Sequence, residues 1–251
     1  GMKRKFILGT ITLAMFVAIG LQSCDDGDDY SLGNFWVDIA TVETDNNSSA
    51  YWFILDDGTT LWPAASDIQY LPEKGQRILL NYSILSDQKD GFDHYIRINY
   101  IWNILTKKTI VLTATNADSI GNDPVKINDM WIGNHYLNVD FSFNYGGIRP
   151  HAINLVENSL IPDPQDGKIH LEFRHNAYGS TSNRLYDGLV CFDLKPYQNN
   201  STDSVTFAIK VLDWNTGDDV TYDIVYKYGE NSTENATKSK NTSVVSSFEF
   251  Y

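Results

Sequence analysis

The chain has 251 residues, of which 42% are hydrophobic and 13% aromatic, and its formal net charge at pH 7 is −13. This apolar content is sufficient for one or two sizeable hydrophobic cores. The acidic balance argues against nucleic-acid binding, which depends on clustered Lys and Arg side chains.

Residues 1–23 have the form of a signal peptide. Gly1 precedes the initiator Met2 and is interpreted as a cloning scar. Residues 3–5 are basic, and residues 6–21 are mostly apolar. Because a spanning helix needs roughly 20 apolar residues, this run is short for a membrane anchor. We expect the leader to be removed, and the loss of its three basic residues would make the net charge −16.

The end of the leader, Leu21-Gln22-Ser23-Cys24, resembles a bacterial lipobox. In such proteins the thiol of the cysteine is acylated and the leader is cut immediately before it. An ordinary signal peptide followed by a chance cysteine is the alternative. Each buried methylene of an acyl chain contributes about 0.8 kcal/mol, so two or three chains on Cys24 would hold the mature protein stably at a membrane.

Residues 24–33 are predicted to form a flexible acidic stalk after the lipidated cysteine. The acidic run also resembles the export signal of surface lipoproteins in Gram-negative anaerobes, and its residues are Asp25, Asp26, Asp28 and Asp29. A plain spacer that faces the periplasm is the alternative. We therefore expect an outer-membrane lipoprotein, displayed at the surface or turned toward the periplasm.

Beyond the stalk the hydrophobic pattern has period two, which predicts an all-β protein. The first predicted domain, residues 34–115, contains strands at 35–43, 50–56, 59–64, 76–83 and 94–103. Asp57-Gly58 is a strong hairpin signal between the second and third strands. Pro63 is expected to end the third strand at a bulge or sheet edge. Five meandering strands favour an OB-like barrel, with half of a small sandwich as the competing architecture.

A polar segment at residues 115–124 separates this barrel from a second predicted domain, residues 116–251. Its clearest strand alternates apolar and polar residues from Leu137 to Asn144. The other predicted strands lie at 125–132, 151–156, 168–175, 185–194, 204–212 and 220–228. Seven strands separated by turns favour a β-sandwich. Polar residues 229–238 are expected to form a long flexible hairpin before a closing strand that ends at Tyr251.

Four strings of this sequence resemble the NigD-like lipoproteins, namely residues 55–66, 75–82, 101–106 and 118–133. The resemblance extends over essentially the whole mature chain. It implies an OB-like N-terminal domain followed by a C-terminal β-sandwich, in agreement with the strand pattern. The family takes its name from a gene beside a bacteriocin gene and has a proposed immunity role. It carries no assigned catalytic residues, so none is implied here.

The sequence contains no nucleophile elbow, Walker loop or dinucleotide-binding motif. Its five histidines match no metal-site spacing: His94, His135, His151, His170 and His175. His170 and His175 lie five apart on one predicted strand, so their side chains are expected on opposite faces. Residues 213–219 offer oxygen ligands but lack the spacing of a calcium loop. We expect no metal, no cofactor and no catalytic residue.

If Cys24 is acylated, Cys191 is the remaining thiol and no disulfide can form within the chain. Its neighbours Val190 and Phe192 favour a small buried hydrophobe over a reactive thiol. Asp118-Ser119-Ile120 and Asp203-Ser204-Val205 resemble the D-S/T-apolar O-glycosylation sites of Gram-negative anaerobes, which makes Ser119 and Ser204 candidate modification sites.

Two tryptophans are candidate binding residues. Trp52 should face away from Tyr51 and Phe53 on its strand, and Trp62 lies near the irregular end of the next, on a hairpin where OB barrels often take ligands. The alternative is that both rings fill the core or a domain interface.

The sequence as a whole predicts a non-catalytic, outer-membrane-anchored lipoprotein that binds a protein partner, of the bacteriocin-immunity type that the resemblance implies. A surface carbohydrate-binding accessory lipoprotein and a small hydrolase are the alternatives. Exposed aromatic residues in a row would favour the first alternative, and a cleft that holds two carboxylates with perturbed pKa values would favour the second.

Overall fold

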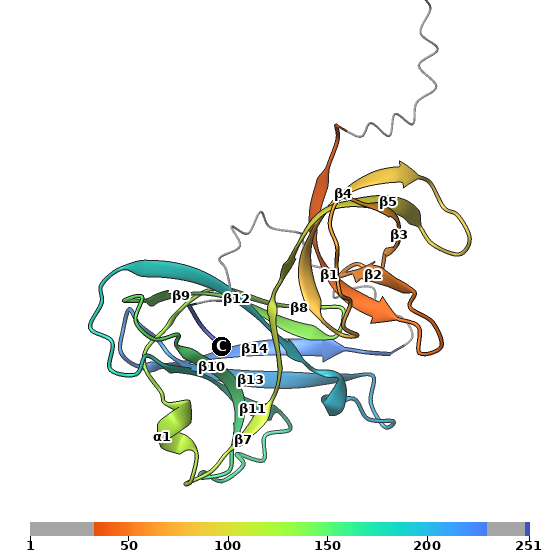
Figure 1. Ribbon diagram of the computed structural model, residues 1–251. Helices are drawn as coiled ribbons and strands as arrows, with labels where there is room; N and C mark the ends of the chain where they lie inside the picture. Colours follow the sequence, from red (N-terminus) through yellow and green to blue (C-terminus); the bar gives the residue numbers. More distant parts are fainter. Residues whose placement is uncertain (1–32, 230–248) are drawn as a thin grey trace, which may run out of the picture.

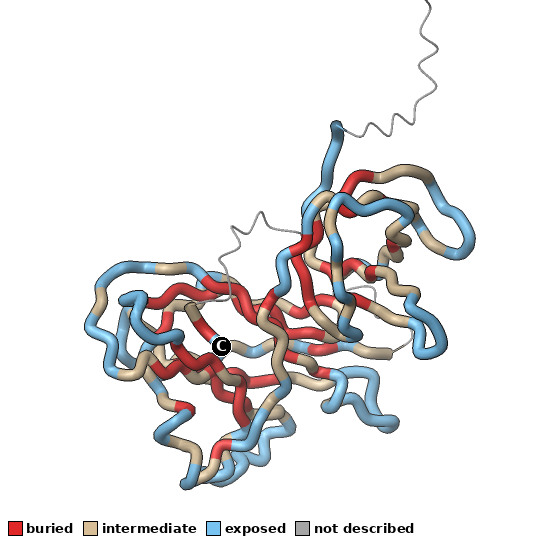
Figure 2. The backbone as a smooth tube through the Cα atoms, viewed as in Figure 1, coloured by how far each residue is buried: buried red, intermediate tan, exposed pale blue. Residues whose placement is uncertain are grey.

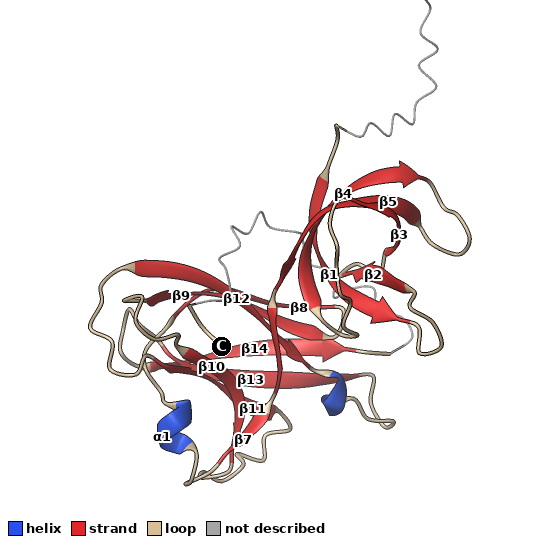
Figure 3. Cartoon of the chain, viewed as in Figure 1, coloured by secondary structure: helices blue, strands red, loops and turns tan. Residues whose placement is uncertain are grey.

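The computed structural model describes residues 33–229 and 249–251. Within them almost all regular structure is β-strand, interrupted by two single turns of helix (Figure 3). The predicted signal peptide, Cys24 and the aspartates after it lie outside the described residues, as does most of the predicted C-terminal hairpin.

The N-terminal domain is a closed five-stranded barrel with the strand order β1-β2-β3-β5-β4. Its strands are β1 (Trp36–Thr44), β2 (Tyr51–Leu55), β3 (Thr60–Ser66), β4 (Arg77–Ser86) and β5 (His94–Asn103). Each corresponds to a predicted strand. Gly58, with φ 88°, turns the chain between β2 and β3, as the Asp-Gly signal predicts. Pro63 lies at a bulge opposite β5, although β3 continues beyond it.

Alternate residues of the barrel strands point inward and form the first core. Ala40 and Val42 of β1 have no exposed surface, and neither do Ile96 and Ile98 of β5. Fully burying an aliphatic side chain of this size contributes roughly 1.5–3 kcal/mol. The odd-numbered residues of β1 are therefore directed outward, which becomes important for the binding surface.

The C-terminal domain is a sandwich of two sheets with the orders β14-β13-β11-β10-β7 and β6-β12-β9-β8. Its strands are β6 (Leu105–Lys108), β7 (Ile110–Leu112), β8 (Lys126–Gly133), β9 (Tyr136–Asn144), β10 (Ala152–Asn158), β11 (Ile169–Asn176), β12 (Leu185–Asp193), β13 (Ser204–Leu212) and β14 (Asp219–Lys227). The two helical turns are α1 (Ala117–Ile120) and η1 (Lys195–Tyr197). Buried strand segments from both sheets face each other in the core (Figure 2).

The pairing of β6 and β7 places the start of the sandwich earlier than the expected boundary between residues 115 and 116. β6 pairs in parallel with β12, and β7 pairs in parallel with β10. Strands of four and three residues are too short to show a periodic pattern. Their partners are also distant in the sequence, so the local residues do not reveal which domain they join.

The last described residues complete the sandwich core. The N–H of His151 donates to the carbonyl of Glu249 at 2.8 Å, and the N–H of Ile153 donates to the carbonyl of Tyr251 at 2.8 Å. Phe250 between them is buried, and its ring packs edge-on against Phe141 with centroids 5.1 Å apart. The C-terminal residues therefore extend the sheet beside β10, as expected for the end of the predicted closing strand.

The barrel and the sandwich meet where the end of β1 approaches the turn between β8 and β9 (Figure 1). A small apolar cluster lies at this junction. Its buried members are Ile104, Tyr136, Leu189 and Cys191, with Ile39 and Trp131 packed against them. Barrel and sandwich are thus joined by packed side chains as well as by the chain itself.

Candidate binding surfaces and the domain junction

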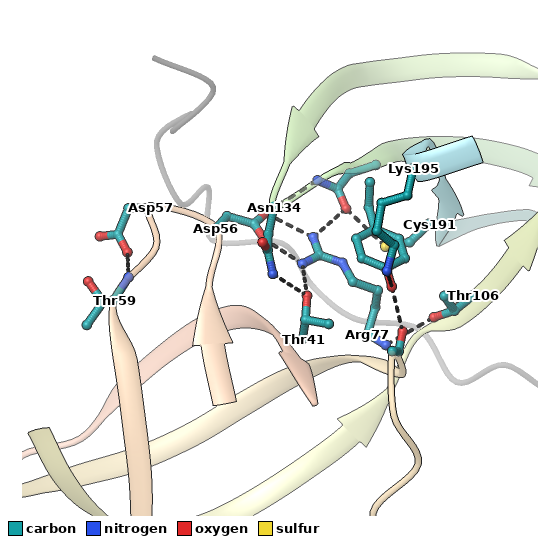
Figure 4. A network of polar contacts seen from close by, with 12 residues as sticks. Thr41, Asp56, Asp57, Thr59, Arg77, Thr106, Asn134, Cys191 and Lys195 are labelled. Atoms are coloured by element: carbon teal, nitrogen blue, oxygen red, sulfur yellow. Dashed lines mark hydrogen bonds and ion pairs between the residues drawn. The ribbon is translucent and has the colours of Figure 1, made fainter. Parts of the chain in front are cut away.

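A buried arginine forms the centre of the junction. Arg77 of β4 has no exposed surface, and its guanidinium forms a two-pronged ion pair with Asp56, with N···O distances of 2.5 and 2.9 Å (Figure 4). Nη1 also donates to Oγ1 of Thr41 at 3.0 Å, and Nη2 donates to Oδ1 of Asn138 at 2.8 Å. Asn138 belongs to β9, so a single side chain connects the two domains.

The charges in this junction explain the pKa shifts there. Burial alone would lower the pKa of Arg77, but the Asp56 carboxylate raises it above its usual value. The Cys191 thiol donates to Oδ1 of Asn138 at 3.0 Å, and burial raises its pKa to about 11. The cysteine is therefore a protonated, buried thiol, and the guanidinium stays charged.

Further contacts hold the two domains close together. Asn134 donates to Oγ1 of Thr41 at 2.9 Å, and the hydroxyl of Tyr136 donates to the carbonyl of Gly75 at 3.1 Å. A Cβ atom at Gly133 would lie 2.0 Å from Oδ2 of Asp56, so only glycine permits this approach. The arrangement fixes one domain against the other.

Outside the junction, the barrel carries an exposed apolar surface that the sequence analysis did not identify. We call Phe35, Val37, Tyr100 and Trp102 the aromatic strip; their exposed fractions are 63, 38, 47 and 39%. Val37 and Tyr100 are both paired with Asn81, on either side of β4. The rings of Tyr100 and Trp102 lie 4.4 Å apart. The strip therefore has two parts on the outer face of the barrel, one at the start of β1 and one on β5, with Asn81 of β4 between them.

The sequence shows that β5 is rich in aromatic and aliphatic residues, but it does not show which of them face outward. Ile96 and Ile98 point inward, and a bulge at Asn99 then moves Tyr100 and Trp102 to the outer face while Ile101 stays inside. A one-residue shift of this kind exchanges the two faces of a strand. Sequence alternation alone could not show where the shift occurs.

The predicted binding residues Trp52 and Trp62 lie together on another part of the barrel surface. Both rings pack against Phe92, with centroid distances of 6.1 and 5.1 Å, and Trp62 also approaches Tyr95. All four side chains are half-buried. They are less accessible than the aromatic strip, so the strip is the stronger candidate for a docking surface.

The candidate modification sites are both exposed. Ser119 lies in α1, where its hydroxyl donates to the carbonyl of Asn116 at 2.9 Å, and Ser204 begins β13. Exposure is compatible with O-glycosylation, which stays a prediction.

The histidines of β11 lie on opposite faces, as predicted. Nε2 of His170 lies 2.9 Å from Oδ1 of the exposed Asp166. His175 is instead buried and forms a hydrogen bond with His151. Among the described residues, no group of three or more His, Cys, Asp or Glu side chains could hold a metal ion. No helix in the described ranges is long and apolar enough to cross a membrane.

Fold and junction together define a two-domain all-β protein in which an OB barrel is fixed to a β-sandwich. Residues 39–104 match the model of the NigD-like N-terminal OB domain, and residues 108–226 match that of the NigD-like C-terminal beta sandwich domain. The chain belongs to the NigD-like family, and the resemblance and fold inferred from its sequence are confirmed.

Solved structures agree with this assignment. A protein of unknown function from Bacteroides vulgatus ATCC 8482 is 34% identical, with a TM-score of 0.69 over 83% of this chain and 97% of that chain. A protein provisionally named as toxin-related, from Parabacteroides distasonis ATCC 8503, is 35% identical, with a TM-score of 0.68 over 80% of this chain and 98% of that one. No protein with a curated description matches the chain.

A more distant structure carries a functional name. A NigD-like immunity protein from Bacteroides caccae ATCC 43185 is 20% identical, with a TM-score of 0.57 over 77% of this chain and 96% of that chain. At this identity the likeness shows a shared fold.

Proposed function

We propose that this protein is a non-catalytic lipoprotein of the cell envelope that binds a protein partner through the aromatic strip, in an immunity role against a protein toxin. The strip carries the proposal, because it exposes Phe35, Val37, Tyr100 and Trp102 on the outer face of the barrel, on either side of β4. Large exposed apolar patches are uncommon on monomeric proteins and mark interaction sites. Tyr and Trp are also the residue types that contribute most to protein interfaces.

A protein partner fits this surface better than a glycan does. Tyr100 and Trp102 are inclined to each other by 51°, and the aliphatic Val37 lies across β4 from them, so the surface is not a flat stacking platform. The names of two similar structures, toxin-related and immunity protein, support a toxin as the partner. Cys24 and the acidic residues after it support attachment to the envelope, with the aromatic strip starting only eleven residues after Cys24.

The test is the sensitivity of a deletion strain to culture supernatants of competing bacteria. The parent, the deletion strain and strains complemented with the wild type or a variant would be compared. The doubly substituted Tyr100→Ser/Trp102→Ser variant should fail to restore survival. Leu71→Ser is the matched control, since Leu71 is also a barrel residue and is 90% exposed but lies outside the strip. Cys24→Ser, with membrane fractionation, tests the anchor separately.

Each outcome has a definite meaning. Selective killing of the deletion strain, reversed by the wild type and Leu71→Ser but not by the double variant, would support both the immunity role and the surface. Equal survival of parent and deletion strain across a panel that contains active killers would reject the immunity role. Restoration by the double variant, present in the membrane at wild-type level, would reject the strip as the docking surface.

A further inference from the structure

A pocket in the sandwich contains chemistry that the proposed function does not use. It has a volume of about 450 Å³ and lies between the loop after β9 and the loop after β11. The polar side chains of its wall belong to Arg149, His151, Tyr178, Ser180, Thr181 and Ser182. We call this the loop pocket. Its volume is in the range of cavities that hold small molecules.

The histidine of the loop pocket is held in one tautomer by a buried hydrogen-bond chain. Nδ1 of His175 lies 3.1 Å from the carbonyl oxygen of Pro124, which can only accept, so this nitrogen carries the proton. Nε2 of His175 is then the acceptor for Nδ1–H of His151, at 2.8 Å. The remaining nitrogen, Nε2 of His151, is therefore unprotonated and can accept a hydrogen bond.

Burial keeps both rings neutral at pH 7. His151 is only 1% exposed although it lines the loop pocket, and burial together with the neighbouring His175 lowers its pKa to about 4. Burial also lowers the pKa of His175. The rings of Phe143 and Tyr145 pack against the imidazole of His151 and hold it in place, with centroid distances of 5.1 and 5.5 Å.

Arg149, the cationic residue of the loop pocket, is also held in a fixed orientation. The guanidinium carbon of Arg149 lies 3.3 Å from the centre of the Tyr178 ring. Tyr178 has a positive φ of 51°, and its N–H donates to Oδ1 of Asn176 at 2.8 Å, which holds the ring beneath the arginine. A guanidinium stacked on an aromatic face keeps its N–H groups directed outward in its own plane, the geometry that binds a carboxylate with two hydrogen bonds.

We propose that the loop pocket binds a small hydroxylated carboxylate, of which a sugar acid is the representative, with Arg149 on the carboxylate and Nε2 of His151 accepting from a hydroxyl group. The guanidinium of Arg149 selects a ligand with a carboxylate, and Nε2 of His151 selects one that also carries a hydroxyl group near that carboxylate. The hydroxyl group of Ser180 adds a donor at the wall, whereas that of Ser182 already donates to the carbonyl of Tyr145 at 3.0 Å. The site lies in the loops of the sandwich, whereas the aromatic strip lies on the barrel, and it does not depend on the proposed immunity role.

Galacturonate is a suitable probe, with galactose and acetate as comparators. The mature chain carrying Cys24→Ser would be titrated with each compound by ligand-observed NMR and calorimetry. Galacturonate should bind at least about tenfold more tightly than either comparator, because each lacks one of the two groups. Arg149→Gln should weaken galacturonate binding by at least about tenfold.

Arg184→Gln is the matched control. Arg184 is also an exposed arginine, and its guanidinium carbon lies 5.2 Å from the centre of the Tyr186 ring, but the residue lies outside the loop pocket. It should leave galacturonate affinity unchanged. Absence of galacturonate binding, or equal binding by Arg149→Gln, would overturn the proposal. Equal affinities for galacturonate and acetate would overturn the role given to His151. Arg149 is exposed, so its variant tests the site without the folding risk of a change at His151.

Discussion

Arg77 of the barrel and Asn138 of the sandwich are joined by a 2.8 Å hydrogen bond between two fully buried side chains. The guanidinium that makes this bond is neutralised by Asp56 within the barrel. A fixed charge is thus enclosed between the domains with most of its donors satisfied. Removal of one partner of a buried ion pair leaves the other partner charged and buried. The resulting loss of folding free energy is larger than the net stability that the intact pair contributes.

Arg77→Met is therefore expected to lower the free energy of unfolding by about 3–5 kcal/mol. Asp56 would lose its cation, and Asn138 and Thr41 would lose a donor. Urea unfolding followed by tryptophan fluorescence measures the change. The double variant Arg77→Met/Asp56→Asn should recover part of the loss, because it removes the uncompensated carboxylate as well.

Arg97→Met provides the control for the Arg77 variant. Arg97 pairs with Asp67 at 2.5 Å, but both side chains are partly exposed, so its removal should cost less than about 1 kcal/mol. If Arg77→Met and Arg97→Met shift the urea midpoint equally, the buried pair has no special role at the junction.

Cys191 is expected to resist alkylation in the folded protein. Its side chain is buried, and the raised pKa leaves almost no thiolate at pH 8. In the Cys24→Ser variant, where it is the remaining thiol, iodoacetamide should modify it slowly in buffer and rapidly in urea. Mass spectrometry over time gives both rates. Similar rates in the two conditions would show that the junction opens readily.

The barrel and most of the sandwich could be predicted because their strands alternate locally. β5 and β13 have the bounds that the sequence indicates, and the other predicted strands differ by a few residues. Period-two burial and turn residues are properties of short segments, so they are visible in the sequence. β6 and β7 were missed because their existence depends on pairing with β12 and β10, which no local pattern reveals.

The candidate site was less predictable for the same physical reason. Trp52 and Trp62 lie on a recognisable hairpin and do form an aromatic cluster with Phe92. Tyr100 and Trp102 reach the surface only because of a bulge, and Arg77 is buried only because a second domain covers it. Contacts between segments that are distant in the sequence decide whether Tyr100, Trp102 and Arg77 are exposed or buried.

Gly188→Ala should destabilise the sandwich although alanine favours folded backbone at most positions. A Cβ atom at Gly188 would lie 2.6 Å from Cζ of Phe141 and 2.8 Å from Cε1 of Phe250. Both rings are fully packed in the core, so relief requires them to move, at a cost of about 1–3 kcal/mol. Thermal unfolding measures the loss. Gly146→Ala, whose new atom would meet Ser182 at an ordinary 3.4 Å, should change the melting temperature little.

The buried His151 and His175 pair should make the protein less stable as the pH falls from about 6.5 toward 4. Burial, and for His151 the neighbouring imidazole, lowers the pKa of both rings from 6.5, to about 4 for His151, while Asp123 opposes the shift. Between these pH values the unfolded chain binds a proton that the folded chain does not, so protonation favours unfolding. The stabilisation is present above pH 6.5 and is lost as the pH approaches the folded pKa.

His151→Gln tests this pH dependence, because its amide can still donate to His175 but cannot titrate. The wild type should lose on the order of 2 kcal/mol between pH 7 and pH 4.5, and the variant should lose clearly less. His175 and His135, whose pKa values are also lowered by burial, contribute to the slope that remains. Urea unfolding at pH 7 and at pH 4.5 measures the loss of unfolding free energy in each protein. Equal losses in the wild type and in His151→Gln would contradict the assignment of the pH dependence to the buried histidine pair.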